Sequence, residues 1–142
     1  MQRGAHAGKH ILVVEDDVPI GEMLQMLLEI EGYRVTVAPL AQQAYDLLAA
    51  AAASPSAARI DVVLLDLQLP DMDGTEIVRP FQERGQPMPP VIVVSARPKL
   101  AVESAALELH AASFLHKPFE IPELLARLDE TLSASAAADQ QR

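Results

Sequence analysis

ILVVEDD, residues 11–17, joins four consecutive apolar residues to three consecutive acids. An unbroken apolar run is typical of a strand that is buried on both faces of a parallel sheet. A buried strand cannot carry charges, so the acids must lie where the strand emerges. In open α/β sheets, ligands bind just beyond the carboxyl ends of the strands. Glu15 and Asp16 are therefore candidate site residues, whereas Asp17, just ahead of Pro19, is better explained as a helix N-cap.

Composition narrows the class of protein. A chain of 142 residues suits one domain, and 50% hydrophobic residues with only 4% aromatic ones imply an aliphatic core. The net charge of −9 argues against direct nucleic-acid binding and against binding to anionic membrane surfaces. Cysteine is absent, which excludes disulfides and thiolate metal sites. No apolar run could span a bilayer and no signal-peptide core is present, so we expect a cytoplasmic protein.

The rest of the chain alternates between strand and helix patterns. Strands are expected at residues 33–37, 60–65, 91–94 and 111–116. Helices are expected from Pro19 to the capping Gly32, over 40–52, from Thr75, over 99–110 and from Ile121. Pro80 should leave the third helix short, kinked or stopped near Arg79. Because crossovers between parallel strands are right-handed, five strand–helix repeats predict a doubly wound, three-layer α/β sandwich.

Composition also sets the expected boundaries of the domain. Residues 1–8 should be a flexible N-terminal segment, residues 9–132 the folded domain, and residues 133–142 a disordered tail or truncated linker. Residues 53–59 should form a loop. Met26 and Ile30 lie off the apolar stripe of the first helix, which makes them candidates for a docking patch.

Polar residues end four of the predicted strands. Glu15 and Asp16 follow the first strand, Asp66 the third, Ser95 the fourth and Lys117 the fifth. Parallel strands end at one edge of the sheet, so these side chains should converge there. Three carboxylates form a hard oxygen site of the kind that Mg²⁺ prefers. Asp66 is suited to be a nucleophile, because Asp carboxylates form aspartyl phosphates whose charge a metal and the Lys117 ammonium would neutralise.

The chain resembles the receiver domain of two-component response regulators over about residues 9–132. The resemblance rests on VVEDD at 13–17, LLDLQLPDMDG at 64–74, VVSA at 93–96 and FLHKPF at 114–119, in the order and near the spacing of the family. It implies a five-stranded parallel sheet of order 2-1-3-4-5 in a flavodoxin-like sandwich, similar to single-domain chemotaxis regulators. Asp71 and Asp73 are expected to be turn and cap residues, with Gly74 required by the backbone.

The resemblance implies a role for each residue of the site. Asp66 would accept a phosphoryl group from a phosphohistidine on a sensor histidine kinase or a histidine phosphotransfer protein. Asp16 would bind Mg²⁺ directly and Glu15 directly or through water, together with Asp66 and the backbone carbonyl of Gln68. Lys117 would contact the phosphate.

Ser95 and Phe114 are the implied switch residues. Ser95 would follow the phosphoryl group on activation, and Phe114 would rotate inward and alter the face of the fourth helix, fifth strand and fifth helix. From the residues alone, Ser95 also suits a helix N-cap and Phe114 an ordinary core position. The resemblance further implies a cis Lys117-Pro118 bond. Where the family often has glycine at the end of the fourth helix, this chain has His110, Ala111 and Ala112.

The leading interpretation is a regulatory domain that assists only its own phosphorylation and dephosphorylation and then binds a downstream protein, with a homodimer allowed. The alternatives are a stand-alone phosphorelay shuttle and the receiver module of a larger regulator. A phosphohydrolase with an Asp nucleophile is weaker, because the dehalogenase type needs an acid two residues after the nucleophile, where Gln68 stands. A nucleotide or flavin module ranks last, because residues 15–19 are acidic rather than glycine-rich.

Overall fold

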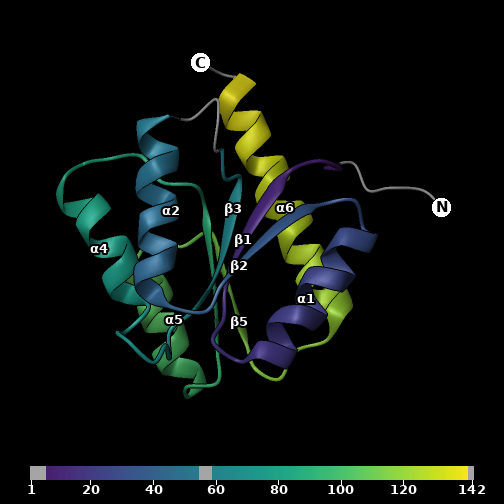
Figure 1. The fold of residues 1–142 in the computed structure, drawn as a ribbon, viewed down its shortest axis with the longest axis horizontal. Helices are drawn as coiled ribbons and strands as arrows, with labels where there is room; N and C mark the ends of the chain where they lie inside the picture. The colour runs from purple at the N-terminus through teal and green to yellow at the C-terminus, as the bar shows by residue number, and fades with distance from the viewer. Residues whose placement is uncertain (1–5, 55–58, 141–142) are drawn as a thin grey trace.

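Five parallel strands form one sheet in the computed structural model, which describes residues 6–54 and 59–140 (Figure 1). The strands are β1 (His10–Val14), β2 (Arg34–Ala38), β3 (Val62–Asp66), β4 (Val91–Ser95) and β5 (Ser113–His116). They lie in the order β2-β1-β3-β4-β5, and every pairing is parallel. The predicted strand order and doubly wound topology are therefore confirmed.

Helices cover both faces of the sheet, as Figure 1 shows. On one face lie α1 (Val18–Ile30) and α6 (Ile121–Gln140). On the other face lie α2 (Ala41–Ala53), α4 (Thr75–Glu83) and α5 (Lys99–Glu108). Within the described residues, none of these helices has the length and apolar character needed to cross a membrane.

The central strands alternate between two hydrophobic clusters. In β1, Ile11 and Val13 pack with the apolar residues of α1 and α6, whereas Leu12 and Val14 pack with those of α2, α4 and α5. Successive side chains of a strand point to opposite faces, so a strand between two helix layers must be apolar throughout. The edge strand β2 is only partly buried, which agrees with its alternating sequence.

The helix α4 passes through Pro80 and ends at Glu83. The prediction that it would be short is confirmed at nine residues, but it does not stop near Arg79. Proline removes one backbone hydrogen bond. Burial of Val78 and Phe81 on either side of Pro80 holds the helical path, and the backbone N–H of Arg84 donates to the Pro80 carbonyl at 3.2 Å.

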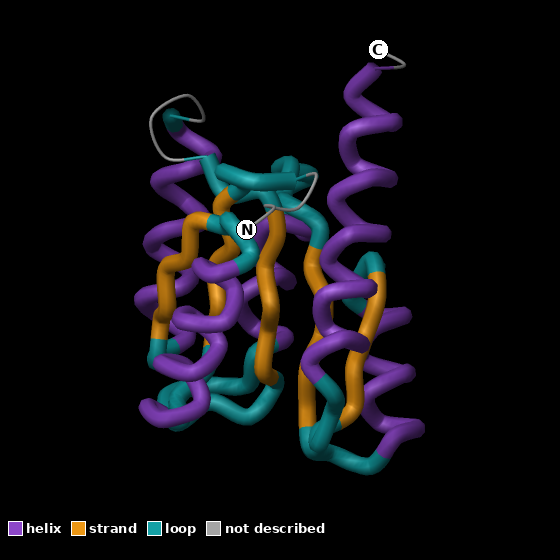
Figure 2. Tube along the Cα trace, turned by 90° about the vertical axis from the view of Figure 1, so that its right-hand side faces the viewer, coloured by secondary structure: helices purple, strands orange, loops and turns teal. Residues whose placement is uncertain are grey.

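The C-terminal helix is longer than the sequence analysis expected. Leu132 is its last buried apolar residue, yet α6 continues to Gln140 and stands beyond the strands (Figure 2). The helix occupies residues 133–140 of the segment expected to be a disordered tail or truncated linker, while residues 141–142 lie outside the described residues. Alanine has the highest intrinsic helix propensity, and alanines supply much of this extension.

The described part of the N-terminal segment is packed rather than free. His6 Nε2 lies 3.1 Å from Ser133 Oγ and 3.2 Å from Asp129 Oδ1 on α6. The backbone N–H of Gly8 donates to the Gly32 carbonyl at 2.8 Å. Within the segment expected to be flexible, residues 1–8, His6 and Gly8 therefore make defined contacts with α6 and Gly32. Residues 1–5, and residues 55–58 of the expected loop, lie outside the described residues.

Three helices end in the same left-handed cap. After α1, α4 and α5, the residue in the left-handed region is Gly32 (φ 100°), Gly85 (φ 63°) and His110 (φ 53°), respectively. At the end of α5, the N–H of His110 donates to the Leu107 carbonyl and that of Ala111 to the Ala106 carbonyl. This pair of bonds is the Schellman motif, in which glycine is the favoured residue. Histidine therefore replaces glycine at a strained position, and β5 begins later than expected, at Ser113.

The helix α2 is capped from another part of the chain. Its own N-cap residue, Leu40, makes no side-chain cap bond. The Asp71 carboxylate accepts hydrogen bonds from the backbone N–H groups of Ala41 at 2.9 Å and Gln42 at 3.0 Å. These bonds hold the pKa of Asp71 below its usual range. The expected cap role of Asp71 is confirmed, but the helix that it caps lies 30 residues earlier.

We expect His110→Gly to stabilise the protein. A non-glycine residue in the left-handed region costs roughly 1–2 kcal/mol, partly offset by the greater freedom of glycine in the unfolded chain. The free energy of unfolding, measured by urea denaturation, should rise by about 0.5–1 kcal/mol. His110→Ala, which keeps the strain, is the matched control and should give no gain. A loss of stability in His110→Gly would contradict the cap assignment.

We expect Asp71→Asn to destabilise the protein in a pH-dependent way. Because the pKa of Asp71 is lowered by folding, its ionised form stabilises the protein above the usual Asp pKa. That contribution is lost as the pH falls through the lowered pKa. Urea denaturation at a series of pH values should therefore show a gap between wild type and variant at neutral pH that closes in acid. A difference in the free energy of unfolding that stays constant with pH would contradict the capping role of the Asp71 carboxylate.

Candidate functional site

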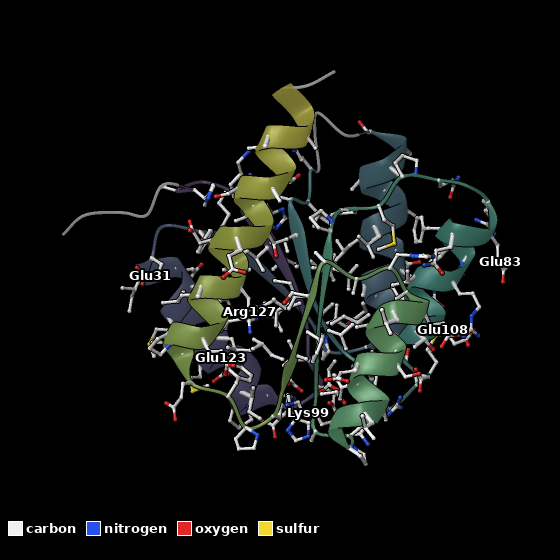
Figure 3. The ribbon with its side chains drawn as sticks, turned by 180° about the vertical axis from the view of Figure 1, so that it is seen from behind. Glu31, Glu83, Lys99, Glu108, Glu123 and Arg127 are labelled. Atoms are coloured by element: carbon white, nitrogen blue, oxygen red, sulfur yellow. The ribbon has the colours of Figure 1, made fainter. Side chains whose placement is uncertain are left out.

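Two carboxylates are buried among the described residues, whereas many charged side chains lie on the outer faces of the helices. Figure 3 labels examples on α5 and α6, namely Lys99, Glu108, Glu123 and Arg127. In contrast, Glu15 is only 4% exposed and Asp66 only 7%. Both lie at the carboxyl edge of the sheet, where β1 and β3 end. A buried charge is costly unless it is paired, so the partners of these two groups define the site.

The ammonium of Lys117 is the shared partner. It follows β5, and its Nζ donates to Glu15 Oε1 at 2.5 Å and to Asp66 Oδ2 at 2.9 Å. Burial raises the pKa of Glu15, against the opposing effect of Lys117. For Lys117, burial acts in the opposite direction and lowers the pKa. The bonds to the two carboxylates outweigh burial, so the pKa of Lys117 lies above its usual value. Lys117 is therefore a stable cation at neutral pH.

Backbone N–H groups hold the remaining carboxylate oxygens. Asp66 Oδ1 accepts from the N–H of Gln68 at 3.0 Å, and Glu15 Oε2 accepts from the N–H of Asp17 at 3.3 Å. Asp17 itself accepts from the N–H of Ile20 at 3.0 Å, which confirms its prediction as the N-cap of α1. Both buried carboxylates are thus oriented by the loops that follow their strands.

A third carboxylate completes the cluster. One oxygen from each of Glu15, Asp16 and Asp66 lies within 4.8 Å of the others, and Asp16 is exposed to solvent. The convergence predicted from the strand ends is therefore present. Three carboxylates face a single ammonium, so the edge retains an excess of negative charge. Hard oxygen donors at this spacing, one of them open to solvent, fit a divalent cation such as Mg²⁺.

The predicted switch residues lie beside this cluster. Ser95 ends β4 with no exposed surface, and its hydroxyl oxygen accepts the backbone N–H of Arg97 at 3.2 Å. The N-cap of α5 is Pro98, so Ser95 is not a helix N-cap. Phe114 lies half-buried on β5, against the cluster formed with α2, α4 and α5. The Lys117-Pro118 bond is cis, as the resemblance implied.

An ion pair that the sequence analysis missed joins the two loops beside Asp66 and Ser95. Arg97 Nη2 lies 2.5 Å from Asp73 Oδ2. The other oxygen of Asp73 accepts from the backbone N–H and the hydroxyl of Thr75, at 3.0 and 2.8 Å. Burial raises the pKa of Asp73, but the bonds from Thr75 and Arg97 outweigh it and lower that pKa overall. Asp73 was expected to be a cap, and nothing in the spacing of Asp73 and Arg97 indicated a pair.

The protein leaves little space behind the carboxylates. The cavity lined by Glu15, Asp66, Lys117 and Phe119 has a volume of about 20 Å³, room for roughly one water molecule. Pockets that enclose small organic ligands are typically 300–1,000 Å³. A reacting group must therefore approach the carboxylates from the solvent side.

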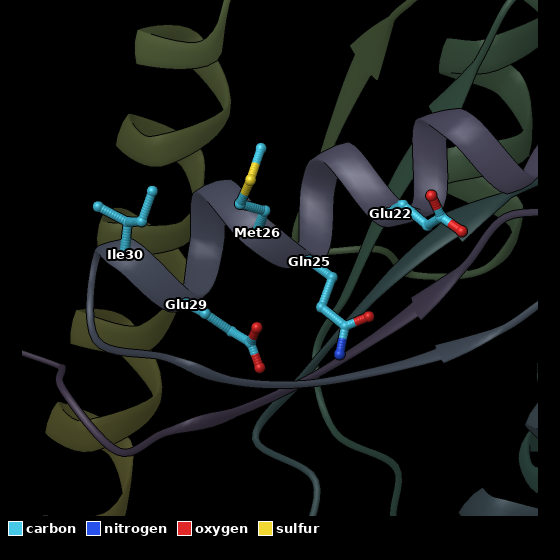
Figure 4. Close-up of a pocket in the computed structure, with 5 residues that line it drawn as sticks. All are labelled: Glu22, Gln25, Met26, Glu29 and Ile30. Carbon is cyan, nitrogen blue, oxygen red and sulfur yellow. The ribbon is translucent and has the colours of Figure 1, made fainter.

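A larger hollow lies on the outer face of α1 and not at the carboxylates. Figure 4 shows the residues that line it, which are Glu22, Gln25, Met26, Glu29 and Ile30. Its volume is about 480 Å³. Met26 and Ile30, the candidate docking residues, are 58% and 54% exposed. These two side chains therefore form an exposed apolar patch on the outer face of α1.

Gly74 lies directly against the backbone of the site. A Cβ at this position would stand 2.4 Å from the carbonyl oxygen of Asp66 and 2.9 Å from the Cα of Leu67. The φ of Gly74 is −57°, so any residue could adopt its backbone conformation. Glycine is required here by the close approach of two backbone segments.

The sequence is similar to a known protein family and to several characterised or named proteins. A family model described as response regulator receiver domain matches residues 11–129. The chain is 36% identical over 129 residues to the response regulator MprA of Mycolicibacterium vanbaalenii, covering 91% of this chain and 52% of that protein. It is 37% identical over 123 residues to the uncharacterized transcriptional regulatory protein YkoG of Bacillus subtilis, covering 87% and 50%. The chain thus spans about half the length of these relatives.

Solved structures of isolated receiver domains match nearly the whole chain. A CheY-like receiver domain protein from Methanospirillum hungatei superposes with a TM-score of 0.76 at 28% identity, covering 93% of this chain and 99% of that one. The non-phosphorylated HemR receiver domain from Leptospira biflexa superposes with a TM-score of 0.74 at 34% identity, covering 88% and 94%. Fold and sequence motifs therefore agree over the same span.

We expect Gly74→Ala to destabilise the protein by about 1–3 kcal/mol, the usual cost of inserting a methyl group where backbone cannot yield. The contact with the Asp66 carbonyl should displace the end of β3 as well. Gly21→Ala in α1 is the matched control, because its added Cβ meets only the Val37 side chain at 3.1 Å. Urea denaturation of both variants provides the comparison. Equal stability of Gly74→Ala and wild type would contradict the close approach.

Proposed function

The chain belongs to the response regulator receiver domain family, and from that premise we propose that it is a phosphorylation-dependent signalling switch with Asp66 as the phosphoryl acceptor. One observation carries this proposal. The Asp66 carboxylate is buried, it is held between the Lys117 ammonium and the Gln68 N–H, and two further carboxylates lie beside it.

The donor in this proposal is a phosphohistidine of a sensor histidine kinase or a histidine phosphotransfer protein. An Asp66 oxygen forms a bond to phosphorus while the bond from phosphorus to the histidine nitrogen breaks. The electron pair of the broken bond stays on the imidazole, which then takes up a proton. The Lys117 ammonium is positioned to balance the charge on the transferred group. The small cavity behind the carboxylates supports a donor that presents its phosphoryl group from outside.

Glu15, Asp16, Asp66 and the backbone carbonyl of Gln68 would hold Mg²⁺ at this edge. When bound, such an ion would supply positive charge that offsets the negative charge of the phosphoryl oxygens. The protein residues hold the acceptor carboxylate in place and leave only a small cavity behind it. In this role the domain is regulatory rather than an enzyme, and it assists only its own phosphorylation and dephosphorylation.

The output of the switch would pass through Ser95 and Phe114. Ser95 would donate its hydroxyl hydrogen to a phosphoryl oxygen, and Phe114 would turn inward as the loop after β4 closes. Such a change would alter the face of α5, β5 and α6, where a downstream protein or a second copy of the chain would bind. The outer face of α1, with Met26 and Ile30 exposed, is the proposed docking surface for the donor protein.

The same site would serve a receiver module of a longer regulator or a stand-alone phosphorelay shuttle. The relative YkoG is named a transcriptional regulatory protein, and the match to half of its length favours a receiver module of a longer regulator. An Asp-nucleophile phosphohydrolase is disfavoured, because Gln68 stands where the dehalogenase type needs an acid and no enclosed substrate pocket adjoins Asp66 in the part of the chain described.

We expect acetyl phosphate to add one phosphoryl group to the wild-type protein in the presence of Mg²⁺. The reason is that Asp66 is the buried acceptor and its reaction needs a divalent cation beside it. Intact-mass spectrometry after incubation, with and without Mg²⁺, measures the adduct.

The matched variants are Asp66→Asn, which should form no adduct, and Asp46→Asn on the exposed face of α2, which should react like wild type. An adduct that survives in Asp66→Asn would place the acceptor elsewhere. Absence of an adduct on wild type, from acetyl phosphate and from a phosphorylated histidine phosphotransfer domain alike, would overturn the proposed switch.

A further inference from the structure

The loop that carries Ser95 is tied to the loop that follows Asp66 by one ion pair. Arg97 Nη2 and Asp73 Oδ2 lie 2.5 Å apart. The two residues are 24 positions apart in sequence and belong to loops after neighbouring strands, β3 and β4. Both side chains are partly buried, with 30% of Arg97 and 37% of Asp73 exposed.

The Asp73 side of the pair is fixed. Its second oxygen is bonded twice to Thr75, the first residue of α4. The next residue, Gly74, donates its N–H to the Leu67 carbonyl at 2.8 Å and packs against the Asp66 backbone. Asp73 is therefore anchored to the start of a helix and to the acceptor strand end, and it cannot move alone.

Arg97 lies in the short loop between β4 and α5. Only three residues separate Ser95, the end of β4, from Lys99, the start of α5. The backbone N–H of Arg97 donates to Ser95 Oγ, so the same residue that pairs with Asp73 also orients the Ser95 hydroxyl. A shift of Arg97 would change the direction of that hydroxyl directly.

We propose that Arg97 is a positioning residue, which anchors the Ser95 loop to Asp73 and thereby sets where the Ser95 hydroxyl stands relative to the phosphoryl acceptor. The proposal rests on the proposed function for its consequence in phosphorylation, but the anchoring itself is a property of the free protein. The pair depends on an arginine two residues after Ser95 and an acid seven residues after Asp66.

The size of the effect follows from the exposure of the pair. Ion pairs with this much solvent contact change local equilibria by about two- to five-fold. Loss of the pair should therefore loosen the loop without unfolding the protein. It should also be weakened by salt, because exposed charges are screened.

Solvent exchange of the backbone amides at positions 96 and 97, measured by NMR on the unphosphorylated chain, tests the anchoring. Arg97→Gln should exchange about two- to five-fold faster than wild type, and Arg97→Lys, which keeps the cation, should restore most of the protection. Arg79→Gln is the matched control, because Arg79 makes a similar pair with Glu108 at 3.1 Å between α4 and α5. Unchanged exchange in Arg97→Gln, or an equal rise in Arg79→Gln, would overturn the proposal.

A double-mutant cycle tests the route through Ser95. The rate of phosphoryl uptake from acetyl phosphate is compared for wild type, Arg97→Gln, Ser95→Ala and the double variant. If Arg97 acts by positioning Ser95, its substitution changes the rate about two- to five-fold in the presence of Ser95 and not in Ser95→Ala. An equal effect in both backgrounds would show direct electrostatics and refute the positioning role. Failure of wild type to react would count against the proposed function, and the amide exchange would still decide the anchoring.

Discussion

One ammonium group organises the functional edge of this protein. Lys117 follows β5, and it reaches past the end of β4 to carboxylates at the ends of β3 and β1. Glu15 and Asp66 are buried, so each needs a cationic partner to offset the loss of hydration. The sheet order supplies that partner, because the ends of β1, β3 and β5 come together only when the chain is wound in this way. Fold and charge pairing therefore depend on each other, and the site is a product of both.

Most of this edge could be predicted from the sequence because buried strands tolerate no charge. Each apolar run marks a strand, and the first polar residue after it marks the carboxyl end. Glu15, Asp66, Ser95 and Lys117 were all found in this way. The same argument holds for the layers, since strands that are apolar at every position must be covered on both faces. Their chemical roles came from the resemblance and from the nature of the side chains, not from periodicity.

The contacts that could not be predicted join residues far apart in sequence through single polar bonds. Asp71 caps α2 and Asp73 binds Arg97, but a surface carboxylate carries no periodic signal that names its partner. Two helix ends, those of α4 and α6, were also not predicted. The continuation of α4 through Pro80 depends on burial around it, and the extension of α6 depends on alanines whose small side chains suit a disordered tail as well as a helix.

The C-terminal part of α6 projects beyond the sheet as a free-standing helical extension. Leu132 is the last apolar side chain that fastens this helix to the sheet, and residues 133–140 continue for about 12 Å at the rise of an α-helix. A small tilt where the helix is fastened becomes a proportionally larger displacement at its tip. Because α6 borders β5, the strand that carries Phe114 and leads into Lys117, the proposed rearrangement of Phe114 would act on the strand against which this helix packs.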